Sequence, residues 1–328
     1  MPRHAIISDV HGNLEALKAV YGDLARLDGL RPSAGSGRAE PVEARSIVSL
    51  GDLVGYGPNP SEVISGLSSL TKKGYTVQYC MGNHDAAIAG RYEFVNIHDP
   101  ADAELLATQA GLKDFAAIAR QYQDPQKRKY IPVTANAKAS AVWTRERLAE
   151  PFRQFILQQS KDHLFLGTGV LCVHASPRDS LFHYVLSGRH AQKALEAPLM
   201  AGVGLCFIGH THIPGIWQLR ADQLVRFAGN VICMEPPRPI RHPQVQLDLE
   251  TTITLVNVGS VGQPRDGNPN ACYAVYDDQA QSVELRRVPY DIATTRQKLL
   301  ASGLPVGLAD KLGTADAEKG VAESDAEE

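Results

Sequence analysis

The chain has 328 residues, of which 44% are hydrophobic, and its formal net charge at pH 7 is -3. That composition allows a large core, and a charge so close to neutral argues against broad binding to nucleic acid or to an anionic membrane. No stretch approaches the roughly 18 uninterrupted apolar residues of a membrane span, and the first residues, MPRHAIISDVHGN, lack the apolar region of a secretory signal. We therefore expect a cytoplasmic protein without a membrane partner, and the sequence leaves its oligomeric state open, a homo-oligomer included.

The five cysteines are scattered and lack the CxxC spacing of metal or redox motifs. Cys80, Cys172 and Cys206 lie inside apolar runs. These features favour small core side chains in a reducing compartment over disulfides.

The first ninety residues alternate short apolar runs with helical patterns. HAIIS predicts a strand at 4–8, and apolar residues recurring at three- and four-residue steps predict a helix over 14–27, which Asn13 is suited to cap. A stretch rich in Gly, Pro and Ser predicts a loop at 31–44. SIVSL at 46–50 and YTVQYCM at 75–81 predict two further strands, with a helix between them over 61–72.

Residues 92–165 have a different character. Helical patterns at 103–122, 137–148 and 151–159, with no strong strand among them, predict a mostly helical insertion or cap within a domain that spans 1–301. After it come GVLCVHAS and GLCFIGHTH, and then the β-rich segments GIWQL, TTITLVNVGS, ACYAVYD and SVELRRV. From 302 large apolar residues become rare, which predicts an acidic, disordered tail over 302–328.

Five of the apolar runs end in side chains that bind metal ions. In chain order these are Asp9 and His11, Asp52, Asn83 with His84 and Asp85, His174, and His210 with His212. Because loops at the carboxyl ends of strands in open α/β sheets meet at one crevice, we expect these side chains to converge. Imidazole, carboxylate and amide ligands without a thiolate favour a pair of divalent ions, Mn, Fe, Zn or Co.

The spacing within two of these clusters also suggests a geometry. Asp9 and His11 are two residues apart, as are His210 and His212, so in an extended chain each pair projects to one side. Glycines at 12, 51, 82 and 209 allow tight turns beside the ions.

Together these blocks closely resemble the calcineurin-like metallophosphoesterase superfamily, whose pattern is Asp-x-His, Gly-Asp, Gly-Asn-His-Asp/Glu, His and Gly-His-x-His. The segments DVHGNLEAL, GDLVGYGPNP and NVGSVGQPRDGNP resemble its branch of small, mostly prokaryotic phosphoesterases. The resemblance implies an α/β fold of four α/β/β/α layers, with two mixed sheets packed face to face and helices outside.

The resemblance also implies a role for each ligand. Asp52 is expected to bridge the two ions, and His84 is expected to be the catalytic residue that assists the leaving group. Asp9, His11 and His212 are expected to complete the shell of one ion. Asn83, His174 and His210 are expected to complete the shell of the other.

One block departs from the Ser/Thr protein phosphatases of this superfamily. GDLVGYG has Gly55 and Tyr56 where those enzymes have the Asp that orients the catalytic histidine and an Arg that binds phosphate. The departure argues against a protein phosphatase and leaves the orienting partner of His84 open. Arg178 in HASPRDS and Arg265 in GSVGQPRDG are the candidate phosphate-binding residues, since arginine binds phosphate in a bidentate manner.

We therefore expect an enzyme, a dinuclear-metal-dependent phosphoester hydrolase in which hydroxide attacks phosphorus without a covalent intermediate. The expected partner is a small phosphoester, either a phosphodiester or a small phosphorylated molecule. The alternatives are a Ser/Thr protein phosphatase, a nuclease, which the near-neutral charge disfavours, and a non-catalytic metal-binding scaffold. The segment 92–165 is expected to shape substrate entry, with a packing insertion or a dimer surface as alternatives.

Overall fold

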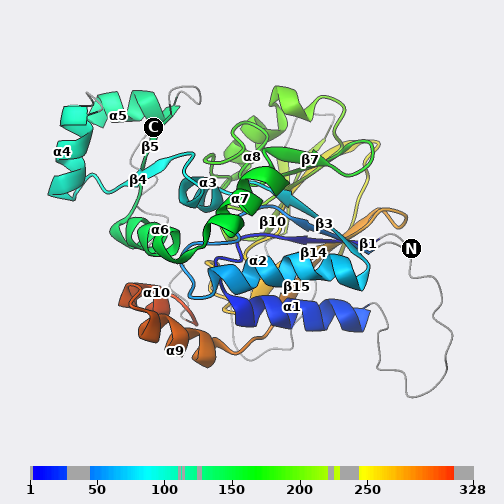
Figure 1. Cartoon of the computed structure of the whole chain (residues 1–328). Helices are drawn as coiled ribbons and strands as arrows, with labels where there is room; N and C mark the ends of the chain where they lie inside the picture. Colours follow the sequence, from blue (N-terminus) through cyan, green and yellow to red (C-terminus); the bar gives the residue numbers. More distant parts are fainter. Residues whose placement is uncertain are drawn as a thin grey trace, which may run out of the picture.

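The computed structural model of the chain describes residues 3–27, 45–109, 112, 115–123, 128–220, 225–229 and 244–313. Two β-sheets pack face to face in these residues, and helices lie on their outer faces (Figure 1). The predicted sandwich of two mixed sheets with helices outside is confirmed.

The first sheet has the strand order β12-β15-β14-β1-β2-β3-β6. The central strands β1, β2 and β3 are parallel neighbours, whereas β14 runs antiparallel to β1. The bounds are β1 Arg3–Ile7, β2 Arg45–Ser49, β3 Tyr75–Cys80, β6 Ser160–Lys161, β12 Gln244–Gln246, β14 Ala271–Asp277 and β15 Ser282–Val288. This parallel trio places the ends of three strands at one edge of the sheet.

The second sheet has the strand order β11-β10-β13-β9-β8-β7. Its strands β8, β9 and β13 are parallel neighbours, and β10 and β7 run antiparallel to the strands beside them. The bounds are β7 His163–Phe165, β8 Val170–Val173, β9 Leu205–Ile208, β10 Gly215–Arg220, β11 Val225–Gly229 and β13 Thr252–Asn257.

The apolar runs of the central strands are explained by burial on both faces. Ile6 and Val48 point between the sheets, where Cys80 and Cys172, two of the three cysteines predicted to lie in the core, are also buried. Ile7 and Ile47 point the other way, onto helices α1 (Leu14–Leu27) and α2 (Pro60–Ser69). On the outer face of the second sheet, Cys206 packs with α8 (Gly188–Leu195).

The predicted first helix and its cap are confirmed. Helix α1 spans Leu14–Leu27, and Asn13 Oδ1 accepts a hydrogen bond from the Ala16 backbone N–H at 3.1 Å. An Asn side chain at this place satisfies one of the backbone donors that a helix start leaves unpaired. The predicted second helix is shorter, because α2 ends at Ser69 and a 3₁₀ turn, η1 (Leu70–Lys73), follows.

The insertion is mostly helical, as predicted, but it also contains strands. Its helices are α4 Pro100–Gln109, α5 Phe115–Gln123, α6 Ala135–Arg147 and α7 Glu150–Gln159. Strands β4 (Glu93–Val95) and β5 (Tyr130–Pro132) pair with each other, while β6 and β7 join the two main sheets. The expectation of a helical segment up to 165 is therefore wrong after Gln159, because strands of two or three residues are too short to show alternation in the sequence.

The folded chain also continues beyond the boundary predicted at 301. Helix α9 (Ile292–Ser302) is followed by α10 (Val306–Asp310), and Leu304, Leu308 and Leu312 are buried with Leu299. Leu304, Leu308 and Leu312 recur every fourth residue, a helical pattern too sparse to stand out beside the acidic end of the chain. The predicted tail is thus wrong for 302–313, and both 314–328 and the predicted loop at 31–44 lie outside the described residues.

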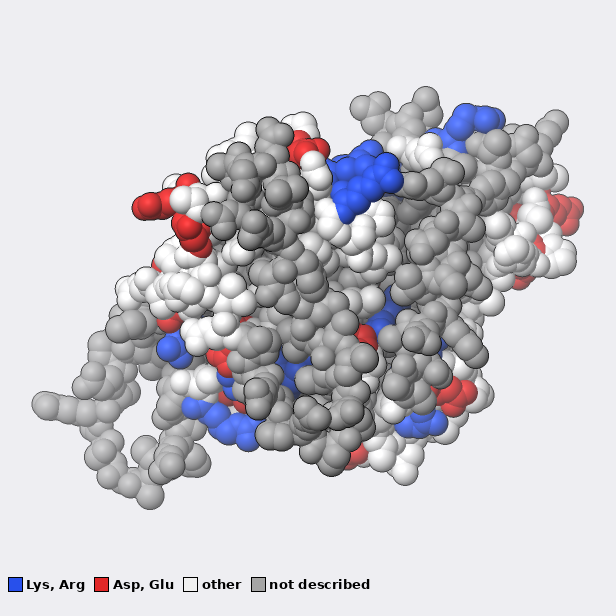
Figure 2. Space-filling view, turned by 180° about the vertical axis from the view of Figure 1, so that it is seen from behind, with Lys and Arg blue, Asp and Glu red and all other residues white. Residues whose placement is uncertain are grey.

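The surface carries charges of both signs. On the face shown in Figure 2, the charged side chains of the described residues form small, separate groups rather than one continuous basic area. None of the helices in the described ranges is long and apolar enough to cross a membrane.

Candidate metal centre

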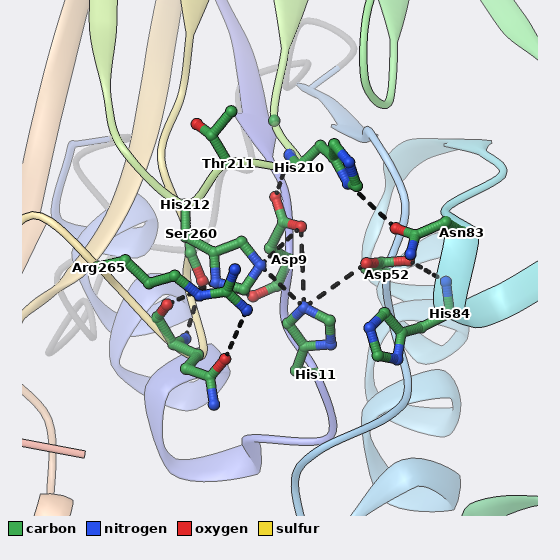
Figure 3. A network of polar contacts seen from close by, with 12 residues as sticks. Asp9, His11, Asp52, Asn83, His84, His210, Thr211, His212, Ser260 and Arg265 are labelled. Atoms are coloured by element: carbon green, nitrogen blue, oxygen red, sulfur yellow. Dashed lines mark hydrogen bonds and ion pairs between the residues drawn. The ribbon is translucent and has the colours of Figure 1, made fainter. Parts of the chain in front are cut away.

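The predicted ligands lie just after the carboxyl ends of strands from both sheets, in loops or, for Asn83, at the start of a helix. They follow β1, β2, β3, β8 and β9 and are, in chain order, Asp9, His11, Asp52, Asn83, His174, His210 and His212. None of the seven is more than 8% exposed. Figure 3 shows the side chains from β1, β2, β9 and the start of helix α3 (Asn83–Ile88) turned toward one another. Convergence of the five clusters, the basis of the sequence argument, is therefore observed.

The first predicted coordination shell is compact. His11 Nε2 lies 3.1 Å from His212 Nε2, which lies 3.3 Å from Asp9 Oδ1. Two atoms bound to one ion at about 2.1 Å lie about 3.0–3.4 Å apart in an octahedral or tetrahedral shell. The three side chains thus have the spacing of ligands around one ion.

The second predicted shell has the same spacing. Asn83 Oδ1 lies 3.0 Å from His174 Nε2 and 3.1 Å from His210 Nδ1. Asp9, Asp52 and His174 also offer ligand atoms within 4.8 Å of one another, so Asp9 lies near both shells.

Asp52 lies between the two shells. Its Oδ2 atom is 3.6 Å from His11 Nε2 on one side and 3.6 Å from His174 Nε2 on the other. This is the place that the predicted bridging role requires, and the role itself stays a prediction.

The backbone at the centre is strained. The described non-glycine residues with positive φ are Asp9, His11, Asp52, Tyr56, His210, His212 and, away from the centre, Gln281. The expectation that the Asp-x-His and His-x-His segments are extended is therefore wrong. A left-handed conformation costs a residue with a β-carbon roughly 1–2 kcal/mol, and such strain is characteristic of functional sites.

Hydrogen bonds fix the orientation of two ligand imidazoles. His212 Nδ1 lies 2.6 Å from the Gln263 carbonyl oxygen, and His11 Nδ1 lies 3.2 Å from that of Val54. A carbonyl oxygen only accepts, so each Nδ1 carries the proton and each Nε2 directs a lone pair into the centre. Asp9 Oδ1 is buried beside them and accepts no hydrogen bond from the described residues. Lone pairs this close repel one another, so this donor set fits a divalent cation.

Electrostatics lead to the same conclusion. Burial lowers the pKa of His174 to about 4 and that of His210 well below its usual range, so both predicted ligands are neutral at pH 7, the form of imidazole that binds metals. Burial, and then the neighbouring Asp85 and Asp9, raise the pKa of Asp52 well above its usual range. A divalent cation relieves this crowding of carboxylates.

The start of α3 is fastened to the loop after β2. The backbone N–H of His84 donates to Asp52 Oδ1 at 2.8 Å, and the Asp85 carboxylate accepts the next two backbone N–H groups after Asp52, at 3.2 Å each. Gly82 permits this approach, since a β-carbon there would lie 2.1 Å from Asp52. Asp85, for which the sequence predicted no role, therefore holds the loop that carries Asp52.

His84 is oriented by aromatic packing. Its ring lies 4.5 Å from the ring of Tyr56 and 5.1 Å from that of Phe94, the latter edge to face. Its Nδ1 is buried without a hydrogen-bond partner among the described residues, and a β-carbon at Gly55 would lie 2.7 Å from it. The partner that the sequence left open is thus not a carboxylate within the described part of the chain.

The two predicted phosphate-binding arginines differ in position. Arg265 donates its backbone N–H to the His212 carbonyl oxygen at 3.2 Å, and Figure 3 shows its side chain extending toward the imidazoles. Its charge lowers the pKa of His11, His84, His210 and His212. Arg178 is exposed, and its charge acts on His183. Arg265 is therefore next to the centre, and the role of Arg178 stays a prediction.

Three aromatic residues at the centre were not predicted. Tyr56 lies 4.7 Å, ring to ring, from His11, Tyr184 lies 4.2 Å from His210, and Phe94 comes from strand β4 of the insertion. Phe94 and Tyr184 carry no local signal, because only the fold brings them to the ligands. Phe94 shows that the insertion reaches His84.

Comparisons with known proteins agree with this arrangement. The family model described as "Calcineurin-like phosphoesterase" matches residues 2–214, a range that includes all seven predicted ligands. The chain belongs to the calcineurin-like phosphoesterase family. This is a family of metal-dependent phosphoesterases, and the chain has the buried His/Asp metal-binding clusters expected of a member.

Similar proteins match nearly the whole length of the chain. The uncharacterized protein MJ0912 of Methanocaldococcus jannaschii is 26% identical over 310 residues, which are 94% of this chain and 96% of that protein. A crystal structure of a metallophosphoesterase from Sphaerobacter thermophilus is 28% identical, with a TM-score of 0.61 over 95% of this chain and 99% of that one. The hypothetical protein PH1004 from Pyrococcus horikoshii OT3, 19% identical, has the same fold with a TM-score of 0.61 over 96% and 99%.

Proposed function

We propose that this member of the calcineurin-like phosphoesterase family is a dinuclear-metal-dependent hydrolase of small phosphoesters, either phosphodiesters or small phosphorylated molecules. The observation that supports the proposal is the position of Asp52, 3.6 Å from a histidine of each predicted shell. The predicted catalytic residue His84 lies next to Asp52, because its backbone N–H donates to the Asp52 carboxylate. The donor atoms suit Mn, Fe, Zn or Co.

A pair of divalent ions held by these ligands would supply Lewis-acid charge for the phosphoryl oxygens and would lower the pKa of water toward neutral pH. The chain's own residues orient the ligand side chains and His84. Carbonyl oxygens fix the imidazoles of His11 and His212 with Nε2 toward the centre. His84, held by Phe94 and Tyr56, assists the departure of the leaving oxygen.

A Ser/Thr protein phosphatase fits the site less well. Gly55 lies against His84 Nδ1, where a carboxylate is needed to orient and polarise the imidazole. A non-catalytic metal-binding scaffold would use the same ligands but has no need of His84, which lies beside Asp52. Turnover by metal-replete protein therefore separates it from an enzyme.

Hydrolysis assays on protein purified with its metals retained test the proposal. We expect Mn²⁺-dependent turnover of bis-p-nitrophenyl phosphate or p-nitrophenyl phosphate, and a fall of about 10²–10⁴-fold in kcat for His84→Asn with metal content unchanged. Turnover of neither compound by metal-replete protein contradicts the proposal. Two tightly held ions without turnover identify a scaffold, and much faster turnover of a phosphopeptide identifies a protein phosphatase.

A further inference from the structure

Two tyrosines lie against the candidate centre, one beside each predicted shell. The Tyr56 ring is 4.7 Å from the ring of His11 and 4.5 Å from that of His84. The Tyr184 ring is 4.2 Å from the ring of His210, and the side chain is 39% exposed. Tyr184 therefore lies at the outer side of the centre, where a substrate arrives from solvent.

Arg265 lies close enough to both tyrosines to influence their hydroxyls. Its guanidinium carbon is 5.9 Å from the centre of the Tyr56 ring, and its charge acts on the hydroxyls of both Tyr56 and Tyr184. The same charge acts on His11 of one shell and His210 of the other. The two tyrosine rings thus lie beside ligands of both shells, with the guanidinium near the Tyr56 ring.

The loop that carries Arg265 is firmly held. Ser260 Oγ donates to the Asp9 carbonyl oxygen at 2.8 Å, and the Arg265 side chain donates to Gln263 Oε1 at 3.1 Å. The next residue, Asp266, forms a buried ion pair with Arg287. A guanidinium has five N–H donors, so Arg265 has the capacity to bind an anion as well as Gln263.

Backbone strain at Tyr56 points to a role for its side chain. Its φ is 53°, a left-handed conformation that disfavours large side chains. Strain of this kind persists where the surrounding structure enforces it, and it clusters at ligand-binding sites. A phenol is protonated at neutral pH and is a hydrogen-bond donor to anionic oxygens.

We propose that the hydroxyls of Tyr56 and Tyr184, together with Arg265, bind the non-bridging oxygens of the substrate's phosphoryl group above the two shells. This inference rests on the proposed function, and it adds two substrate-binding residues. Donors that the fold holds in place beside a metal centre bind an anion more strongly than donors that must reorganise. The rings of both tyrosines pack on ligand histidines, and their hydroxyls select for a phosphoryl group.

Removal of each hydroxyl tests the inference, because phenylalanine keeps the packing of the ring. We expect Tyr56→Phe and Tyr184→Phe each to weaken binding of inorganic phosphate to the metal-loaded protein by about tenfold in titration calorimetry, with metal content unchanged. Where the protein hydrolyses a phosphoester, we expect KM to rise in both variants. Tyr21→Phe is the matched control, since the buried Tyr21 hydroxyl has no hydrogen-bond partner among the described residues.

Each result has a definite meaning. Wild-type phosphate affinity in both variants overturns the inference, as does the absence of phosphate binding by wild-type protein. Loss of metal from the phenylalanine variants also overturns it, because the hydroxyls then act on the centre rather than on phosphate. If phosphate binding depends on both hydroxyls but no phosphoester is hydrolysed, the proposed function fails and the phosphate site stands.

Discussion

Replacement of Asp52 with asparagine tests the geometry of the centre most directly. Asp52 Oδ2 lies 3.6 Å from Nε2 of both His11 and His174, within reach of both predicted shells. Loss of a partner outside the coordination shell already lowers metal affinity by about 10–100-fold, and we take this as the minimum for each ion. Because hydrolysis needs both ions, the two factors multiply, and we expect kcat/KM to fall by about 10²–10⁴-fold or more.

The same variant should leave the metal-free fold intact. Asparagine keeps Oδ1, which accepts the His84 backbone N–H at 2.8 Å. It also removes a carboxyl whose pKa is raised by burial and then by the charges of Asp85 and Asp9. We therefore expect metal-free Asp52→Asn to be at least as stable as metal-free wild-type protein in urea denaturation.

A ligand of a single shell provides the control. Asn83 lies 3.0 Å from His174 Nε2 and belongs to the second predicted shell. After removal of loosely bound metal, we expect elemental analysis to find about two ions per wild-type chain, about one in Asn83→Ala and fewer in Asp52→Asn. Retention of both ions and of wild-type activity by Asp52→Asn refutes the bridging geometry.

Three further predictions concern His84, acid stability and the end of the chain. Phe94→Ala removes the ring that packs edge to face with His84. We expect kcat to fall about tenfold, a part of the acceleration that general-acid catalysis provides, with the metal content unchanged in elemental analysis. The free energy of unfolding of the metal-free protein, measured in urea, should fall as the pH falls from about 6.5 toward 4. The unfolded chain binds protons on imidazoles that burial keeps neutral in the folded protein, and stability that does not change with pH contradicts this prediction. At the centre, five imidazoles have a lowered pKa and outnumber the two carboxyls with a raised pKa, Asp52 and Asp85. These imidazoles are those of His11, His84, His174, His210 and His212. Leu308→Ala should cost about 2–5 kcal/mol in the same denaturation assay if α10 is part of the folded core, and a value near zero argues against it.

The sequence by itself determined the central strands of the sheets and the kinds of side chain at the metal centre. Runs such as Leu205–Ile208 are buried on both faces, so hydrophobicity alone marks them as core strands. The ligands follow these strands within a few residues, so their positions at the strand ends could be predicted from local spacing. The family pattern then supplied a partner for each ligand, and the distances around Asn83 agree with it.

Only the tertiary structure decided how the ligands are presented and what surrounds them. The left-handed backbone at Asp9 and His11 is imposed by contacts with the neighbouring loop, whereas the spacing of the two residues suggested an extended chain. Phe94, Tyr184 and Arg265 reach one centre from three separate segments. Their proximity depends on the order of strands in the two sheets, and local sequence patterns carry no information about contacts between segments so far apart.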